Sequence, residues 1–242
     1  MLLLFWLLLA QSVGQENTDS LLVQARYLYN NRHLNDSNYS RSRKIWEDIV
    51  NLDQHNQEAL RGLSEMNLDL AEQAKTKAEK ISFYQKGMVL AETLIKVNEK
   101  NPWGHFWYAA NYGEICRIRG VLKSLTGLKK IRAEFDRALE LDSLNTDVIY
   151  ARAVVYFESP GFAHGDKKKG VAYLKKAIVI DPKFTLPYYE LAQYYARIKK
   201  YEAAKELLNQ ILDIKDPKYP ADYFIKDKPK TLKLLAEIEE RK

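Results

Sequence analysis

The chain contains very little cysteine, proline or glycine. A single cysteine, Cys116, among 242 residues excludes an intrachain disulfide and a zinc site built from several thiolates. Seven prolines and ten glycines leave few residues that would interrupt a helix. Since 46% of the residues are hydrophobic and 29% are charged, the composition is that of a folded, helical protein and excludes a disordered chain.

Histidine is also scarce, and its four occurrences form no catalytic pattern. None of them has a partner at the spacing of a metal site or of a catalytic triad. The sequence also lacks a glycine-rich phosphate loop and a serine nucleophile elbow. We therefore expect no catalytic residue, no metal ion and no cofactor, and the sequence predicts a protein that is not an enzyme.

Positive charge exceeds negative charge, with 38 Lys and Arg against 32 Asp and Glu and a net charge of +6. An excess of this sign can indicate binding to nucleic acid. The two signs alternate along the predicted helices, however, as at Arg132, Glu134, Asp136 and Arg137, which is typical of solvent-exposed faces. We expect no nucleic-acid partner.

A series of helix pairs fills almost the whole chain. In the clearest pair, Leu191-Ala192 lies among aromatic residues and is followed by Tyr201, Ala204, Leu208 and Ile211 at helical spacing. This is the pattern of a tetratricopeptide (TPR) hairpin. Five hairpins and a capping helix predict an all-α, right-handed superhelical TPR-like solenoid over residues 20–242. The predicted helices are 20–34 with 39–52, two within 56–98, 102–125 with 128–142, 146–158 with 166–180, 184–197 with 200–214, and the cap 227–241.

The N-terminus, residues 1–14, has the pattern of a signal peptide. The nine residues after Met1 are apolar, which is too few for a bilayer span of about 20 residues. Small residues follow at Ala10, Ser12 and Gly14, as at a cleavage site. We expect an exported protein of the periplasm or cell envelope. An N-terminal anchor is the alternative.

The first helices of such hairpins line a concave surface. Alignment of Ala110, Ala153 and Ala192 places aromatic residues three positions earlier in register, which predicts an aromatic ladder along the groove. The predicted contacts with a partner or ligand are Trp107, Tyr108, Asn111, Glu114, Tyr150, Phe157, Tyr189, Gln193 and Arg197. A surface of this kind suits a partner's helix or tail, or a small, partly apolar ligand. A shift of one residue in register would instead make these aromatics part of the core.

Three stretches resemble the T-component of tripartite ATP-independent periplasmic (TRAP) transporters: residues 101–113, which begin Asn101-Pro102-Trp103, the helix 127–142, and the tail 228–239. This resemblance implies an extracytoplasmic solenoid that associates with a periplasmic substrate-binding protein, forms homo-oligomers and has a cavity for a partly apolar ligand. Many members of that family are lipoproteins, whereas this chain has no cysteine after the apolar run.

The region around Trp107 also resembles the regulators of microtubule dynamics, another helical-repeat family. The signal-like N-terminus argues against that family. The sequence therefore predicts an exported TPR-type scaffold that associates with a TRAP substrate-binding protein and assists solute uptake. Two alternatives stay open, a general envelope scaffold for protein–protein interaction and a ligand-binding protein that acts alone.

Overall fold

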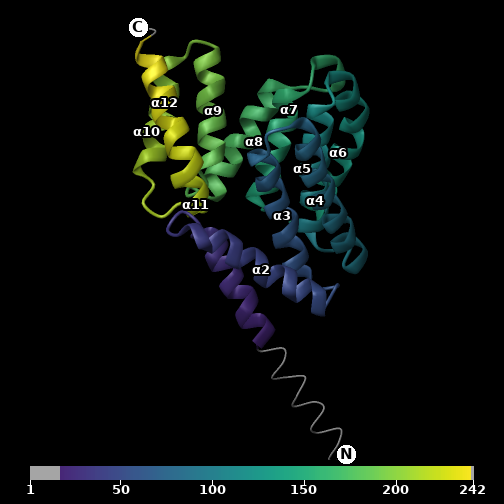
Figure 1. Ribbon diagram of the computed structural model, residues 1–242. Coiled ribbons are helices and arrows are strands. Elements are labelled where there is room, and N and C mark those ends of the chain that lie inside the picture. The colour runs from purple at the N-terminus through teal and green to yellow at the C-terminus, as the bar shows by residue number, and fades with distance from the viewer. Residues whose placement is uncertain (1–16, 241–242) are drawn as a thin grey trace, which may run out of the picture.

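The computed structural model describes residues 17–240, except for the side chains of residues 121–126. All regular elements of residues 17–240 are helical, which confirms the all-α fold (Figure 1). The predicted signal peptide, residues 1–14, lies outside the described residues.

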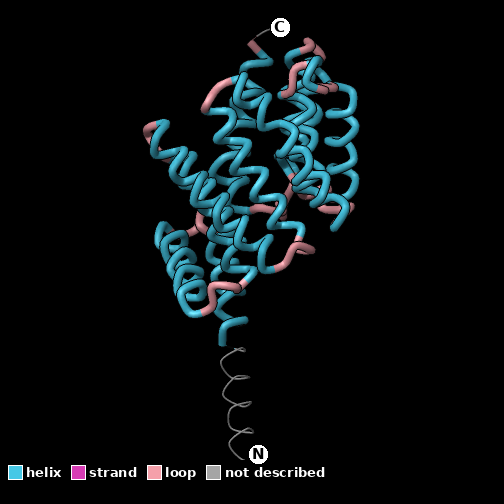
Figure 2. The backbone as a smooth tube through the Cα atoms, turned by 90° about the vertical axis from the view of Figure 1, so that its right-hand side faces the viewer, coloured by secondary structure: helices cyan, strands magenta, loops and turns pink. Residues whose placement is uncertain are grey.

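Five antiparallel hairpins follow one another and stack into a solenoid, as predicted (Figure 2). The hairpins are residues 17–30 with α2 (Asp36–Leu52), α3 (Gln57–Gln73) with α4 (Lys77–Val97), α5 (Pro102–Ile118) with α6 (Val121–Leu141), α7 (Thr146–Glu158) with α8 (Lys167–Ile180), and α9 (Thr185–Arg197) with α10 (Tyr201–Asp213). A short 3-10 turn, η1 (Gly161–Ala163), lies between α7 and α8. The chain ends in α11 (Pro220–Asp222), the π-helical turn η2 (Tyr223–Asp227) and α12 (Lys228–Glu239), which caps the stack on α10.

Short polar side chains define where the helices begin and end. Asn56 and Asn145 cap α3 and α7 by accepting hydrogen bonds from free backbone N–H groups of the first turn. Asp53, Asp142 and Asp181 each follow the second helix of a hairpin, and each carboxylate accepts a hydrogen bond from the N–H two residues later. These aspartates close the exit turns, and their common position explains why three second helices share one ending.

One predicted boundary is wrong. The spacing predicted a helix over 102–125, whereas α5 ends at Ile118 and α6 already begins at Val121. Gly120 lies in the turn with a φ of 98°, which glycine adopts without the strain that a Cβ would cause. Gly127, in the predicted turn, lies inside α6, where a Cβ would be 2.5 Å from the Cys116 Sγ atom. Gly127 therefore allows close packing of α5 on α6 rather than a turn.

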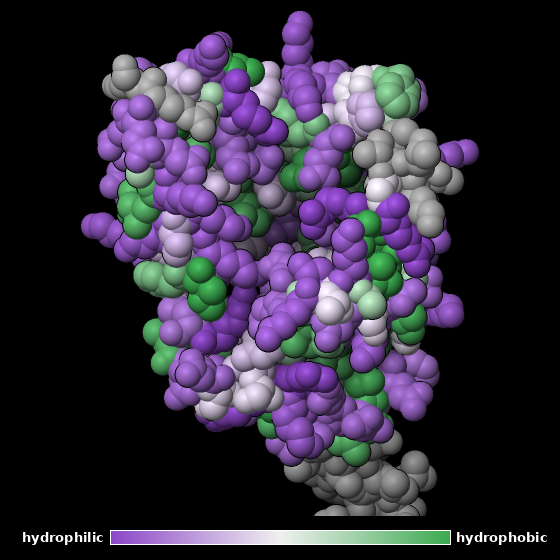
Figure 3. Space-filling model, turned by 45° about the horizontal axis from the view of Figure 1, so that its top comes forward, coloured by the Kyte–Doolittle hydropathy of each residue, from purple (hydrophilic) through white to green (hydrophobic). Residues whose placement is uncertain are grey.

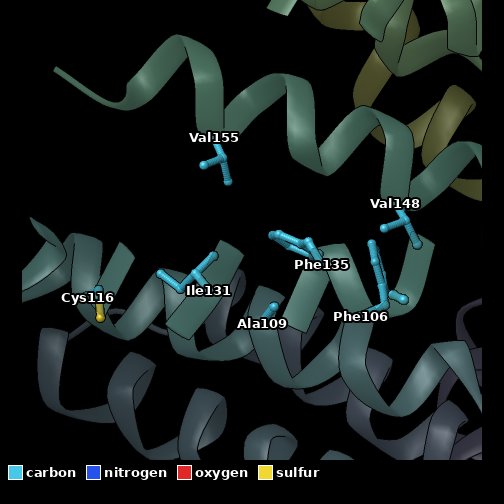
Figure 4. Close-up of a cluster of buried hydrophobic side chains, with 8 residues drawn as sticks. Phe106, Ala109, Cys116, Ile131, Phe135, Val148 and Val155 are labelled. Atoms are coloured by element: carbon cyan, nitrogen blue, oxygen red, sulfur yellow. The ribbon is translucent and has the colours of Figure 1, made fainter. Parts of the chain in front are cut away.

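Apolar clusters repeat along the solenoid and are shared between adjacent hairpins. Trp46 is fully buried among residues of the first helix, α2 and α3. In the middle, Phe106, Phe135 and Val148 come from α5, α6 and α7 (Figure 4). At the C-terminal end, Ile238 of α12 covers the cluster of α9 and α10. Because each hairpin buries its apolar face only against its neighbours, the stack depends on every unit in it.

A buried charge cluster joins the two ends of the solenoid. We call this cluster, formed by Arg32, Asp69, Asp222 and Lys226, the clasp. The Asp69 carboxylate of α3 is 5% exposed, accepts a hydrogen bond from Tyr29 Oη (2.6 Å) and lies 2.9 Å from Lys226 Nζ. Arg32 Nη2 lies 2.7 Å from Asp222 Oδ1 and 3.3 Å from Asp69 Oδ2. In Figure 1, α11 accordingly lies beside the first hairpin, although most of the chain separates them.

His105 joins α5 to α6 and to the turn before α5. Its Nδ1 atom is 2.7 Å from Glu134 Oε2, and its Nε2 atom is 2.9 Å from the Glu99 carbonyl oxygen. Both partners are acceptors, so both ring nitrogens donate when the imidazole is protonated. Burial lowers the pKa of His105, but the hydrogen bonds to Glu134 and Glu99 outweigh burial and raise this pKa above its ordinary value of 6.5.

We expect Lys226→Met to lower the free energy of unfolding by about 2 kcal/mol, because the buried Asp69 carboxylate loses a cation while the apolar stem is kept. The value is below that of a fully buried pair since the Lys226 side chain is 29% exposed. Urea unfolding measures the change. Lys233→Met, on the exposed face of α12, is the matched control and should have no effect. Equal effects of the two substitutions would show that the clasp does not stabilise the fold.

We expect the stability difference between wild type and His105→Gln to depend on pH. Because the pKa of His105 is higher in the folded than in the unfolded state, its contribution is complete below the ordinary value of 6.5 and is lost as pH rises through the folded pKa. Urea unfolding on the two sides of this range should show a larger difference at the acidic pH. His55→Gln, in an exposed turn, is the matched substitution of a histidine outside this network and is measured in parallel. A constant difference for His105→Gln would contradict the assignment.

Candidate binding groove

A cavity of about 690 Å³ lies between the α5–α6 hairpin and α7. In Figure 4, Val155 points from α7 toward Ile131 and Phe135 of α6, which lie on the opposite wall. The space-filling view shows a hollow with hydrophobic side chains on part of its wall (Figure 3). The apolar wall residues are Leu68, Phe106, Trp107, Ala110, Leu128, Ile131, Phe135, Tyr150, Ala151, Val154 and Val155. The volume is within the range of sites for small ligands, and we call this cavity the groove.

The groove exists because α5 and the turn after it present small residues toward α7. Ala110 and Gly113 of α5 and Gly120 of the turn line it. Among the side chains that the structure describes, a Cβ at Gly113 would meet only Ile131 Cδ1, at 3.8 Å, so these side chains leave space above this glycine. A larger side chain on this face of α5 would fill the space into which Val154 and Tyr150 of α7 project.

One end of the groove is charged. Glu114 and Arg117 of α5 and Glu158 of α7 line it there. Arg117 Nε lies 3.0 Å from Glu114 Oε2, which also accepts a long hydrogen bond from Tyr84 Oη. Burial raises the pKa of Glu158, and the nearby charge of Glu114 raises it further. Two carboxylates against one guanidinium favour a ligand that brings hydrogen-bond donors or a positive charge.

Three of the nine predicted contact residues, Trp107, Glu114 and Tyr150, line the groove together. The Trp107 Nε1 atom is buried and has no hydrogen-bond partner among the described residues. The Tyr150 ring packs edge-on against Phe184 with centroids 5.6 Å apart, and burial, followed by the charge of Glu190, raises the pKa of Tyr150. Trp107 and Tyr150 thus form part of the predicted aromatic ladder.

The prediction that Asn111 faces the groove is wrong. Asn111 is fully buried, and its Nδ2 atom lies 3.3 Å from Ser64 Oγ of α3 and donates to the Trp107 carbonyl (2.9 Å). A Cβ on Gly87 of α4 would come within 2.4 Å of Asn111 Oδ1. Trp107 and Glu114 of the same predicted stripe line the groove, whereas Asn111 packs against α3 and α4, because the groove face of α5 begins one residue earlier. That face contains Phe106, Ala110, Gly113 and Arg117.

Tyr108 and Phe157 belong to the core, so their assignment to the groove is also wrong. Tyr108 is 4% exposed and packs against Tyr112 with ring centroids 5.9 Å apart. Phe157 is 5% exposed and packs against Tyr194 at 5.1 Å. The sequence left open that a shift in register would place these aromatic residues in the core. Tyr108 and Phe157 are placed in that way, because they fill the space between helices.

The remaining three predicted residues lie on α9, outside the groove wall. Gln193 Nε2 donates to Tyr189 Oη at 3.3 Å, and the Tyr189 ring packs against the C-terminal apolar cluster. The Arg197 side chain is 61% exposed and its nearest carboxylate, Glu190, is 3.9 Å away. Their role as contacts of a partner stays a prediction.

Sequence reasoning missed Arg117 and Glu158 as groove residues. Tyr150, Val154 and Glu158 follow one another at intervals of four, so helical spacing from Tyr150 could have found Glu158. Arg117 lies seven residues after Ala110, two helical turns further along the same face of α5. The predicted stripe followed the neighbouring face and therefore did not include Arg117.

Within residues 17–240, no three side chains of His, Cys, Asp or Glu come close enough together to hold a metal ion. None of the helices in this described part of the chain combines the length and the apolar character needed to cross a membrane.

The structure is similar to solved TPR proteins. TTC0263, a thermophilic TPR protein of Thermus thermophilus, matches with a TM-score of 0.64 and 17% identity, over 92% of this chain and 97% of that chain. MamA (41-end) from Desulfovibrio magneticus RS-1 matches with 0.46 and 13%, over 79% and 94%. YrrB, a TPR protein with an unusual peptide-binding site, matches with 0.42 and 16%, over 90% and 97%. The likeness to TTC0263 confirms the TPR-type solenoid; at these identities nothing follows about ligands.

No curated protein matches the chain in sequence. A tetratricopeptide-repeat model matches residues 187–217, where the repeat pattern is clearest. The model of the family described as Regulator of microtubule dynamics protein 1-3 matches residues 21–159, more than half of the chain. Neither model confirms the resemblance to the TRAP T-component. The signal-like N-terminus argued against the family of microtubule regulators, and that inference was wrong. The chain has the fold of TPR-type interaction scaffolds and belongs to the family of regulators of microtubule dynamics proteins 1-3.

Proposed function

We propose that this protein is a scaffold that binds a protein partner through the groove between α5, α6 and α7. The observation that carries this proposal is the open apolar cavity of about 690 Å³ with an acidic end. TPR-type solenoids bind partners on their concave surfaces, and an apolar groove suits an amphipathic helix or tail. In this proposal the stacked helices hold the groove open, and the partner's segment binds to its accessible apolar wall.

The groove selects for one chemical class of segment. Its wall offers Trp107, Tyr150 and Val154 to apolar side chains, each of which gains about 1.5–3 kcal/mol on full burial. At the acidic end, Glu114 and Glu158 accept hydrogen bonds or pair with a cation. The proposed occupant is an apolar segment of the partner with a lysine or arginine next to it.

The family's description supplies the first partner to test. Because the family is described as regulating microtubule dynamics, we propose that the partner is tubulin polymer or a protein bound to it. The net charge of +6 supports this proposal if the partner's surface is acidic, since a positive charge raises the rate of encounter.

We expect Val154→Phe to weaken binding about tenfold, because the larger ring fills the groove and removes the space for the partner's apolar side chains. Val179→Phe on α8 is the matched control: Val179 is 80% exposed and outside the groove wall, so the same substitution should leave binding unchanged. Co-sedimentation of the full chain with polymerised tubulin measures binding, and thermal unfolding shows that both variants are folded.

The outcomes separate the two parts of the proposal. Failure of the wild-type chain to co-sediment would exclude tubulin polymer alone as the partner. Wild-type binding that Val154→Phe does not weaken would show that the contact lies outside the groove.

The apolar N-terminus favours a second proposal, in which the chain is exported and acts in the periplasm or cell envelope. For an exported chain, the resemblance to the TRAP T-component leads us to propose that the partner is a periplasmic substrate-binding protein and that the two act together in solute uptake. A general envelope scaffold, a homo-oligomer, or a protein that binds a small, partly apolar ligand by itself are variants of this proposal. Cell fractionation tests export directly. Recovery of a TRAP substrate-binding protein with the wild-type chain, but not with Val154→Phe, would favour the transporter.

A further inference from the structure

A second cavity, of about 390 Å³, lies where the loop between α7 and α8 folds back. We call it the cationic cavity. Its wall includes Arg132 of α6, Arg152 of α7 and Lys169 of α8, with Tyr156 and His164 beside them. Three successive helices thus bring their cations into one space. The cavity is separate from the groove, although Ser159 lines the groove and contacts Arg132.

The buried guanidinium groups have more donors than acceptors. Arg152 is only 7% exposed, and its Nη1 atom is buried without a hydrogen-bond partner, while its Nε atom lies 2.9 Å from Asp136 Oδ1. Arg132 Nη2 donates to Ser159 Oγ and to the Ala163 carbonyl, but its Nε atom is buried and unpartnered among the described residues. A buried donor without an acceptor costs about 1–3 kcal/mol, and more when it is charged.

Positive charge also exceeds negative charge here. Burial and then the nearby charge of Arg152 lower the pKa of Arg132. Two carboxylates offset part of the charge. Asp136 is half-exposed beside Arg152, and Asp166 accepts a hydrogen bond from the Lys169 N–H as the cap of α8. Because the buried Arg152 guanidinium and the partly buried Arg132 guanidinium repel each other, an added anion would stabilise the arrangement.

The loop that shapes the cavity is held in place by its own contacts. The Gly165 N–H donates to the Pro160 carbonyl at 2.9 Å, and the Asp166 N–H donates to the Tyr156 carbonyl at 3.2 Å. A Cβ at Gly165 would be 1.9 Å from the Ser159 carbonyl oxygen, so only glycine fits this close approach. A preformed cavity spares a ligand the entropic cost of ordering it.

We propose that the cationic cavity binds a phosphate group. The oxygens of a phosphate would accept hydrogen bonds from the free N–H groups of Arg132 and Arg152 after a small rotation of each guanidinium, and from Lys169 at the rim. The donors come from three helices, which suits the three terminal oxygens of a phosphate monoester better than the two of a carboxylate. The ring of Tyr156 lies 5.1 Å from Arg152 Cζ and 5.9 Å from Lys169 Nζ, which holds both cations at the cavity.

The phosphate can be free or carried on a larger molecule, and calorimetric titration of the full chain distinguishes the two sources. The probes are inorganic phosphate, phenyl phosphate and acetate. We expect phosphate to bind and acetate to bind at least tenfold more weakly. Tighter binding of phenyl phosphate than of inorganic phosphate identifies a phosphate monoester as the natural occupant, whereas the reverse order identifies free phosphate.

Two variants test the assignment of residues. Arg152→Gln should weaken phosphate binding at least tenfold, because it removes a buried charged donor. Lys169→Gln should weaken it severalfold, and since Lys169 is exposed this variant tests the proposal even if Arg152→Gln does not fold. Lys183→Gln is the matched control, because Lys183 is an exposed lysine paired with Asp216 outside the cavity.

Absence of phosphate binding by the wild-type chain would overturn the proposal. Equal binding of acetate and phosphate, or equal losses in Lys169→Gln and Lys183→Gln, would also overturn it, because either result would indicate a general effect of net charge. Val154→Phe, in the groove, should leave phosphate binding unchanged. The proposal for the groove and the proposal for the cationic cavity can therefore be disproved independently.

Discussion

The buried carboxylate of Asp69, together with the other ion pairs of the clasp, holds the two ends of the solenoid together. It lies within 2.9 Å of a tyrosine hydroxyl from the first hairpin and of an ammonium group from the C-terminal tail. Solenoids are otherwise built from contacts between neighbouring repeats alone. Here long-range ion pairs join the first hairpin and α3 to the C-terminal tail, and Leu68, the residue before Asp69 on α3, lies in the wall of the groove.

The two cavities lie near the same turn after α7 and differ in chemistry because different residues line them. The groove combines apolar walls with Glu114 and Glu158, whereas the second cavity gathers cations around buried guanidinium groups. Ser159 stands between them: its hydroxyl accepts a hydrogen bond from Arg132 and donates one to the Val155 carbonyl. The loop of residues 159–165 is longer than a TPR hairpin needs, and the extra residues form one side of the cationic cavity.

Membership of the microtubule-regulator family and the TPR-type fold are both compatible with the proposed role in binding. The occupant proposed for the groove, an apolar segment with a basic neighbour, would make that role specific. A scaffold of this kind needs rigid walls more than reactive groups. The ion pairs and hydrogen bonds that tie distant segments together, at the clasp and at His105, supply that rigidity.

The sequence by itself determined the helices, their pairing and their order, because helical periodicity, polar caps and exit aspartates such as Asp142 are local signals. It also singled out Trp107, Glu114 and Tyr150, which line the groove, while their role in binding stays a prediction. Only the tertiary structure decided that Asn111 and Phe157 are buried, since a shift of one residue turns a side chain by about 100° around a helix. The clasp and the meeting of Arg132 and Arg152 at one cavity were likewise invisible in the sequence. The residues of each cluster lie on different helices, and no local pattern encodes a contact that forms only when the helices pack together.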